Sequence, residues 1–308
     1  MILPADVLRE VNDFFEDLTK FNINHEFKEL NFSRGNRNYE RILKRLEGLN
    51  LPDPSLLIFQ SLTLKEIKEL LIQIMCKIFG SNYKEKIQFL NRMIRLENIN
   101  DPFEATIEEK FEGDILHPVN VFISNQCKSI QVVSTGHEYV HCFQSPYVTT
   151  LYNRKINNIH YKELLSIIVE YIVCYELSIM LKDDTLLAKH DLIRINHDFN
   201  QAQERKASLA IEPKLNKLNP IDRDQLKSYI EYQKHNSFGY IISDIYATHL
   251  FDEYLDKPET LIQIIKEIIE SDKCIMDLIT YYNLSLTNQE VIGKYNAKID
   301  EVSKRKVL

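Results

Sequence analysis

The segment Val132-Val-Ser-Thr-Gly-His137-Glu138-Tyr-Val-His141-Cys-Phe143 determines which fold this chain is expected to adopt. Residues on an α-helix advance by about 100° each, so His137 and His141 lie one turn apart on one face. At that spacing both imidazoles can reach a single Zn²⁺ at about 2.0–2.1 Å. Glu138 lies on the same side, where a general base for water is needed. The segment predicts a zinc-binding helix, and the alternative is a surface helix with two histidines and a capping or salt-bridging glutamate.

A catalytic zinc needs a third protein ligand, and the next helical segment offers carboxylates. It reads His160-Tyr-Lys-Glu163-Leu-Leu-Ser166-Ile-Ile-Val-Glu170, and acids among so many apolar residues are usually paired or metal-bound. Glu163 follows His141 by 22 residues and is the expected third ligand, with His160 as the alternative. Glu170, two turns further on, is expected to hold a ligand histidine in place. Its alternative role is a solvated or salt-bridged acid.

These residues carry a family resemblance. His137-Glu138-Tyr139-Val140-His141, followed by Glu163-Leu164-Leu165-Ser166-Ile-Ile-Val-Glu170, resembles the thimet oligopeptidase and oligoendopeptidase F group of gluzincin metallopeptidases. That group shows His-Glu-x-Gly-His and then Glu-Leu-Pro-Ser-x-x-x-Glu. The resemblance implies one zinc ion bound by His137, His141 and Glu163, with Glu138 as the base. Val140 and Leu165 depart from the group's Gly and Pro.

A second stretch, Ser237-Phe-Gly-Tyr240-Ile-Ile-Ser-Asp-Ile-Tyr-Ala247-Thr-His-Leu250-Phe251, is similar to the group's tyrosine-rich helix. Aligned from Ala247, Tyr240 falls on a tyrosine that donates to the tetrahedral intermediate, a role that fits oxyanion stabilisation. Alternatively, Tyr240 packs in the core with its hydroxyl hydrogen-bonded to a backbone group. His235, just before this stretch, is expected to contact substrate or, alternatively, to make a helix-end hydrogen bond. The resemblance covers roughly residues 115–260, and the group's members are much longer.

The segment Pro118-Val-Asn-Val-Phe-Ile-Ser-Asn125 alternates in polarity and is rich in β-branched and aromatic residues, which predicts a strand just before the zinc helix. In peptidases of this type, an edge strand beside the metal binds substrate by strand addition. Asn120 and Phe122 are therefore expected to contact substrate. The alternative is an interior strand of a small sheet.

Helical periodicity dominates the rest of the chain, and only 7 Gly and 9 Pro interrupt it. The expected fold is mainly α, a zincin-like metallopeptidase domain with a small sheet edge beside the HExxH helix. Residues 1–100 form a predicted helical region and residues 101–308 the catalytic domain, with one continuous core as an option. The predicted helices span about 4–21, 39–49, 61–79, 83–96, 129–143, 160–181, 187–210, 220–235, 237–255, 258–269, 274–282 and 288–304.

The composition excludes some classes of partner. With Lys+Arg 38 against Asp+Glu 45, the net charge of −7 argues against nucleic acid. No apolar run reaches the roughly 18 residues of a membrane span, and the first residues do not resemble a secretory signal. Five scattered cysteines without a CxxC indicate a reducing compartment, so a cytoplasmic location is expected. Delivery into another cell by a dedicated secretion machine fits the same features.

The function expected from the sequence is a zinc-dependent endopeptidase or oligopeptidase acting on a peptide or protein. The main alternative is a helical interaction protein that is inactive or keeps zinc for structural reasons. Zinc-dependent hydrolysis of another kind of bond is a third option. Oligomeric state and cleavage preference are left open.

Overall fold

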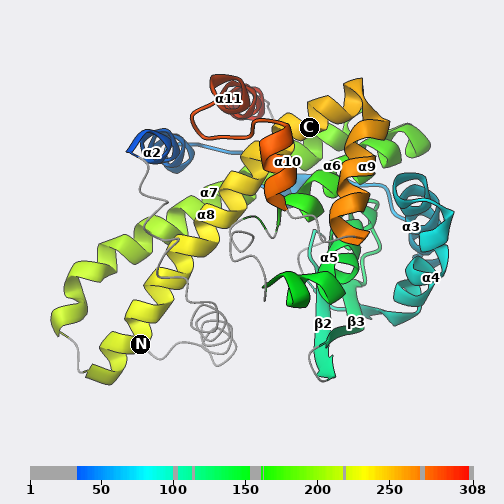
Figure 1. Cartoon of the computed structure of the whole chain (residues 1–308), viewed down its shortest axis with the longest axis horizontal. Helices are drawn as coiled ribbons and strands as arrows, with labels where there is room; N and C mark the ends of the chain where they lie inside the picture. Colours follow the sequence, from blue (N-terminus) through cyan, green and yellow to red (C-terminus); the bar gives the residue numbers. More distant parts are fainter. Residues whose placement is uncertain are drawn as a thin grey trace.

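The computed structural model of the chain describes residues 33–99, 103–112, 115–152, 161, 163–217, 220–270 and 275–304. The predicted helix 4–21, His160 and Cys274 lie outside the described residues. The described part is mainly helical with one small sheet, as predicted (Figure 1). The α-helices are α2 (Ser33–Glu47), α3 (Leu64–Phe79), α4 (Lys84–Met93), α5 (Ile130–Tyr152), α6 (Leu164–Leu181), α7 (Leu186–Ile211), α8 (Pro220–Asp256), α9 (Pro258–Glu270), α10 (Ile275–Tyr281) and α11 (Gln289–Lys304). Short 3₁₀ turns occur at Pro54–Leu56, Ser81–Tyr83 and Glu212–Lys217.

Local sequence signals explain how α3 begins and ends. The hydroxyl of Thr63 accepts from the backbone N–H of Glu66, and the Glu66 carboxylate accepts from the backbone of Thr63, which forms a capping box. Gly80 ends the helix at φ 93°, a backbone conformation that suits glycine. The helix ends at Phe79 as predicted, but it begins at Leu64, three residues after the predicted start.

Several helices are longer than predicted, and α8 and α5 differ most. The segments 220–235 and 237–255 form the single helix α8. Asn236 between them does not break a helix, and a single glycine such as Gly239 is tolerated inside one. α7 and α8 lie side by side as a long antiparallel pair (Figure 1). α5 likewise continues to Tyr152, beyond the predicted end at residue 143.

The sheet has the strand order β1-β3-β2. β3 (Ile115–Ser124) pairs in parallel with β1 (Ile94–Glu97) on one side and antiparallel with β2 (Ala105–Glu112) on the other. The expectation that the strand before the zinc helix lies at a sheet edge is therefore wrong, and its interior alternative is right. The predicted helix 83–96 ends earlier than expected, as α4 at Met93, and the residues that follow it form β1.

The two faces of β3 meet different surroundings. Val121 and Ile123 are fully buried in the hydrophobic core. Side chains alternate along a strand, so Asn120 and Phe122 lie on the opposite face. Asn120 donates a hydrogen bond to the Glu108 carboxylate on β2 at 2.6 Å. The role of Asn120 and Phe122 as substrate contacts stays a prediction, but strand addition at β3 no longer supports it.

α6 is the central helix of the core and packs against α5, α7 and α8. It is long and apolar enough to cross a membrane by composition, but 72% of it is buried inside the protein, as in the core helix of a globular fold. One hydrophobic cluster extends from Tyr39 on α2 to Val302 on α11. The predicted division near residue 100 stays a prediction.

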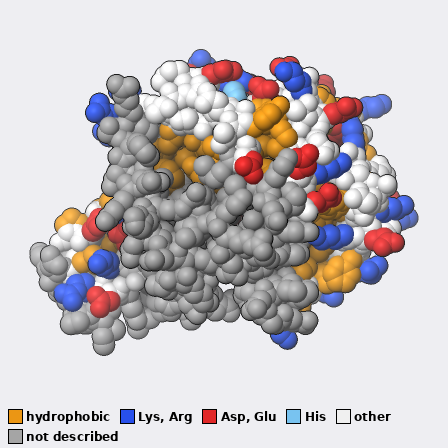
Figure 2. All heavy atoms as spheres, in the orientation of Figure 1, with side chains coloured by type: hydrophobic (Ala, Val, Ile, Leu, Met, Phe, Trp, Pro, Cys, Tyr) orange, Lys and Arg blue, Asp and Glu red, His pale blue; other side chains and the backbone are white. Residues whose placement is uncertain are grey.

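On the face in Figure 2, basic and acidic side chains are interspersed over the described residues.

Candidate metal centre

The two central residues of the HExxH motif anchor α5 in the core. Tyr139 and Val140 are fully buried. The Tyr139 hydroxyl donates to the Asn91 side chain on α4 at 2.6 Å, and the amide of Asn91 donates in turn to the backbone oxygen of Lys68 at 3.0 Å. This anchorage fixes the rotation of α5. His137, Glu138 and His141 consequently lie on the partly exposed side of the helix.

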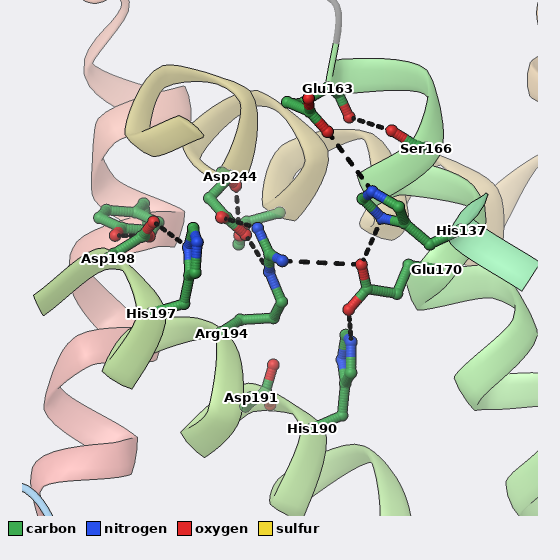
Figure 3. Close-up of polar contacts among 12 residues, drawn as sticks. His137, Glu163, Ser166, Glu170, His190, Asp191, Arg194, His197, Asp198 and Asp244 are labelled. Atoms are coloured by element: carbon green, nitrogen blue, oxygen red, sulfur yellow. Dashed lines mark hydrogen bonds and ion pairs between the residues drawn. The ribbon is translucent and has the colours of Figure 1, made fainter. Parts of the chain in front are cut away.

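A close approach of α5 and α6 brings the third carboxylate to the histidines. A Cβ atom on Gly136 would lie 3.2 Å from a methyl carbon of Val173 on α6, so glycine permits this approach. Glu163 is the residue that immediately precedes α6. The hydroxyl of Ser166 donates to the backbone oxygen of Glu163 at 3.0 Å and fixes the start of the helix (Figure 3).

Three side-chain atoms converge between the two helices. His141 Nε2 lies 3.1 Å from His137 Nε2 and 3.1 Å from Glu163 Oε2, and His137 Nε2 lies 3.4 Å from the same oxygen. Ligands bound tetrahedrally to zinc at about 2.0–2.1 Å lie about 3.3 Å from one another. The three atoms therefore have the spacing of three corners of a zinc tetrahedron, and these residues could hold a metal ion.

The centre is buried on one side and more open on the other. The side chain of Glu163 is 6% exposed and that of His137 is 12% exposed, whereas His141 is 27% exposed. A fourth ligand such as water can therefore approach from the side of His141. This fits a catalytic site, which keeps one coordination position open.

Nearby carboxylates determine the proton affinity of His137. Burial lowers its pKa, but hydrogen bonds to Glu163 and Glu170 outweigh this and raise the pKa to about 10. A proton and a divalent cation compete for the same ring lone pair. The negative field that raises this pKa therefore also favours a cation between the two imidazoles.

Glu138 has a pKa above its usual value. Burial raises the pKa, His141 and His137 lower it, and Glu163 and Glu170 raise it further. A carboxylate with a raised pKa is a stronger base and takes up a proton more readily. Glu138 is thus suited to accept a proton from a water in the centre.

Glu170 lies behind His137 at the centre of a polar network (Figure 3). One of its oxygens is 2.7 Å from His137 Nδ1, and the other is 2.7 Å from His190 Nε2. Arg194 Nη1 lies 3.6 Å from Glu170, while the Nε and Nη2 groups of Arg194 bond the carboxylate of Asp244 on α8. Burial alone would raise the pKa of Glu170, but the charge of Arg194 and the bonds to the two histidines hold it well below its usual range.

A second group of possible ligands, His197, Asp198 and Asp244, lies between α7 and α8. The guanidinium of Arg194 already supplies the positive charge there, because it bonds both oxygens of Asp244. Burial still raises the pKa of Asp198 to about 6 and that of Asp244 to about 7. Tyr295 on α11 donates to Asp198. We assign this group to the protein core and not to a metal.

The remaining predicted residues lie on α8. Tyr240 is partly buried, and its ring packs edge-on against His197 on α7, with the ring centres 4.8 Å apart. This contact involves the ring of Tyr240 and not its hydroxyl group. The role of Tyr240 as oxyanion donor therefore stays a prediction. His235 lies within the same helix, and its side chain is outside the described residues.

Sequence reasoning missed His190, Arg194 and Asp244. A signal for the first two was present, because His190, Arg194 and Asp198 recur every fourth residue and so share one face of α7. A buried stripe of polar residues indicates a partner network. Nothing local indicated that Asp244, 50 residues further along the chain, is the partner of Arg194.

No family model and no curated protein matches this sequence. A solved structure that does match is the crystal structure of a Bacillus anthracis protein assigned as an oligoendopeptidase F. The likeness has a TM-score of 0.47 and 12% identity and covers 97% of this chain, which spans 57% of the length of that protein. A fold does not determine a reaction. The function of this chain therefore has to follow from its own side chains.

Proposed function

We propose that this chain is a zinc-dependent peptidase of the HExxH-plus-glutamate type. One observation supports this above all: His137 Nε2, His141 Nε2 and Glu163 Oε2 lie 3.1–3.4 Å from one another on the side of α5 that carries Glu138. Two imidazoles and a carboxylate are a ligand set of catalytic zinc in peptidases. A structural zinc site usually has four protein ligands and no open position.

Each residue has a defined part in the proposed reaction. Zinc, when bound, supplies a Lewis acid that polarises a peptide carbonyl and makes a water more acidic. Glu138 accepts the proton of that water as the attack begins and later passes it to the leaving amine, for which its raised pKa is favourable. Tyr240 is the proposed hydrogen-bond donor to the oxyanion, a role that rests on the family resemblance. Glu170 orients His137 through its Nδ1.

The outer edge of β2 is the better position for a substrate strand than β3. Within the described part of the chain, β2 pairs only with β3, and it lies against α5, which carries the motif. An extended peptide could therefore pair with the outer edge of β2 near the metal. The substrate is a peptide or a protein, and a general oligopeptidase and a dedicated protease both fit this geometry. The cytoplasmic location stays a prediction.

The departure at Val140 does not argue for an inactive protein. Its side chain is fully buried in the core of this chain and does not lie on the exposed side of the motif. The valine side chain therefore does not reduce the space beside the proposed metal site. The inactive or structural-zinc alternative remains an outcome of the experiment below.

The test uses the full chain loaded with zinc and a library of internally quenched peptides. Wild type should cleave members of the library, and Glu138→Gln should keep zinc but lose turnover by several orders of magnitude. Glu85→Gln, an exposed position on α4, is the matched control and should keep full activity. Stoichiometric zinc without cleavage of any peptide or protein would support a structural zinc instead, and unchanged turnover in Glu138→Gln would contradict the assigned base.

A further inference from the structure

Glu170 receives more positive and donor groups than a residue that only orients one histidine needs. Its side chain, on α6, is 10% exposed. It contacts His137 from α5 and both His190 and Arg194 from α7 (Figure 3). His190 and Arg194 belong to α7, and α7 supplies none of the three proposed metal ligands, which are His137, His141 and Glu163.

Arg194 connects Glu170 to a second helix. Its Nε lies 3.0 Å from one oxygen of Asp244, its Nη2 bonds the other oxygen, and its Nη1 faces Glu170 at 3.6 Å. Only the planar fork of a guanidinium can face two carboxylates in this manner. A lysine ammonium is a single point charge and could keep one of the two partners, so the guanidinium fixes Glu170 relative to α8 as well as α7.

His190 restricts Glu170 from the other side. It is 1% exposed, and its Nε2 donates to the Glu170 oxygen that does not face His137. The ring of His190 also packs edge-on against Tyr171, with the ring centres 4.8 Å apart. With both oxygens engaged, the carboxylate of Glu170 cannot rotate without losing a hydrogen bond.

The orientation of Glu170 matters for the metal through His137. An ionised carboxylate only accepts hydrogen bonds, so the ring hydrogen of His137 lies on Nδ1. In the neutral form of the ring, which is the form that binds a cation, the lone pair then lies on Nε2, which faces Glu163 and His141. If Glu170 turned away, His137 could place its hydrogen on Nε2, and that nitrogen would no longer be a ligand.

We propose that His190 and Arg194 are positioning residues, which hold the carboxylate of Glu170 directed at His137, so that α7 sets the metal affinity of a centre to which it contributes no ligand. This inference rests on the proposed zinc function and extends it to residues of α7. It predicts that the two side chains act on zinc through Glu170 alone.

The test measures the zinc dissociation constant of the full chain by competition with a chromophoric chelator. His190→Phe and Arg194→Lys should each weaken zinc binding by about 10–100-fold, the usual effect of residues behind the ligands. His190→Gln, which retains a donor near the position of Nε2, should recover most of the loss. Tyr254→Phe is the control, because it removes a buried hydrogen bond to Glu176 on the same helix α6 and should leave zinc affinity unchanged.

A double-mutant cycle separates positioning from general loss of structure. In the Glu170→Gln background, His190→Phe and Arg194→Lys should cause no further loss of affinity, whereas independent effects would add. Additive losses, or zinc binding as tight as wild type in the single variants, would overturn the proposal while leaving the zinc function intact. A wild-type chain that binds no zinc would overturn the zinc function itself. If Arg194→Lys does not fold, His190→Phe and His190→Gln decide, since both leave the pair of Arg194 and Asp244 in place.

Discussion

The carboxyl groups of Glu138 and Glu170 both lie near His137, yet their pKa values shift in opposite directions. Burial dominates at Glu138 and raises its pKa. At Glu170 burial acts in the same direction, but Arg194 and the two histidine bonds outweigh it and hold the pKa low. Neighbouring carboxylates with separated pKa values commonly have different roles. Here one is suited to move a proton and the other to stay ionised.

Tyr240 provides a test at a single hydroxyl group. If it donates to the oxyanion, Tyr240→Phe should lower kcat on the order of 100-fold, the typical effect of removing one such donor. Zinc content and melting temperature should barely change, because the ring that packs against His197 is retained. Steady-state kinetics with a cleaved library peptide measure this. Wild-type kcat in the variant would assign Tyr240 to packing only.

His197 provides a test of pH dependence. Burial and then the charge of Arg194 lower its pKa to about 4, although Asp244, Glu170 and Glu163 oppose this. The unfolded chain takes up the proton at a pKa of about 6.5, before the folded chain does, so this residue costs stability as the pH falls below about 6.5. The unfolding free energy of wild type should therefore fall more than that of His197→Asn between about pH 7.5 and about pH 5. Urea titrations at both values measure the difference, and parallel decreases would contradict it.

At the scale of elements, the contact between α5 and α6 determines whether the ligands meet. Gly136 precedes His137, and a Cβ atom on it would lie 3.2 Å from a methyl carbon of Val173 on α6. Gly136→Leu should destabilise the chain by about 1–3 kcal/mol through overpacking. It should also weaken zinc binding, because the helix with the two histidines moves away from Glu163.

A second helical glycine is the control for this prediction. A Cβ atom on Gly293 of α11 would meet no other atom within 4 Å, so Gly293→Ala should stabilise the chain by up to about 1 kcal/mol through helix propensity. Urea unfolding and zinc titration of both variants check the pair. Equal zinc affinity in wild type and Gly136→Leu would contradict the importance of this contact.

Local signals predicted most helices and the three residues that converge between α5 and α6, whereas pairing between distant segments was not predicted. The HExxH spacing and the acids among the apolar residues at the start of α6 predicted these side chains, because helical geometry brings residues three and four apart onto one face. β2 was missed because its residues Glu108, Glu109 and Lys110 are exposed, which hides the alternation of a strand. The central position of β3 depends on β1 and β2, and no short-range pattern specified those partners.

At the scale of the molecule, the core crosses the predicted boundary near residue 100. β1 lies before that boundary and pairs with β3 after it, and α3 packs against both α5 and α6. We therefore expect the full chain to unfold in one cooperative transition. The chain has no Trp, so far-UV circular dichroism and tyrosine fluorescence are the two probes to compare in urea. Separate midpoints for the two probes would indicate two independent units.

Zinc K-edge X-ray absorption on the purified full chain tests the proposed metal centre most directly. We expect one tightly bound zinc whose nearest shell contains only nitrogen and oxygen at about 2.0–2.1 Å, with the scattering pattern of two imidazoles. One imidazole should disappear from that pattern in His141→Gln. A shell containing sulfur at about 2.3 Å, or a protein that retains no zinc, would contradict a centre formed by His137, His141 and Glu163.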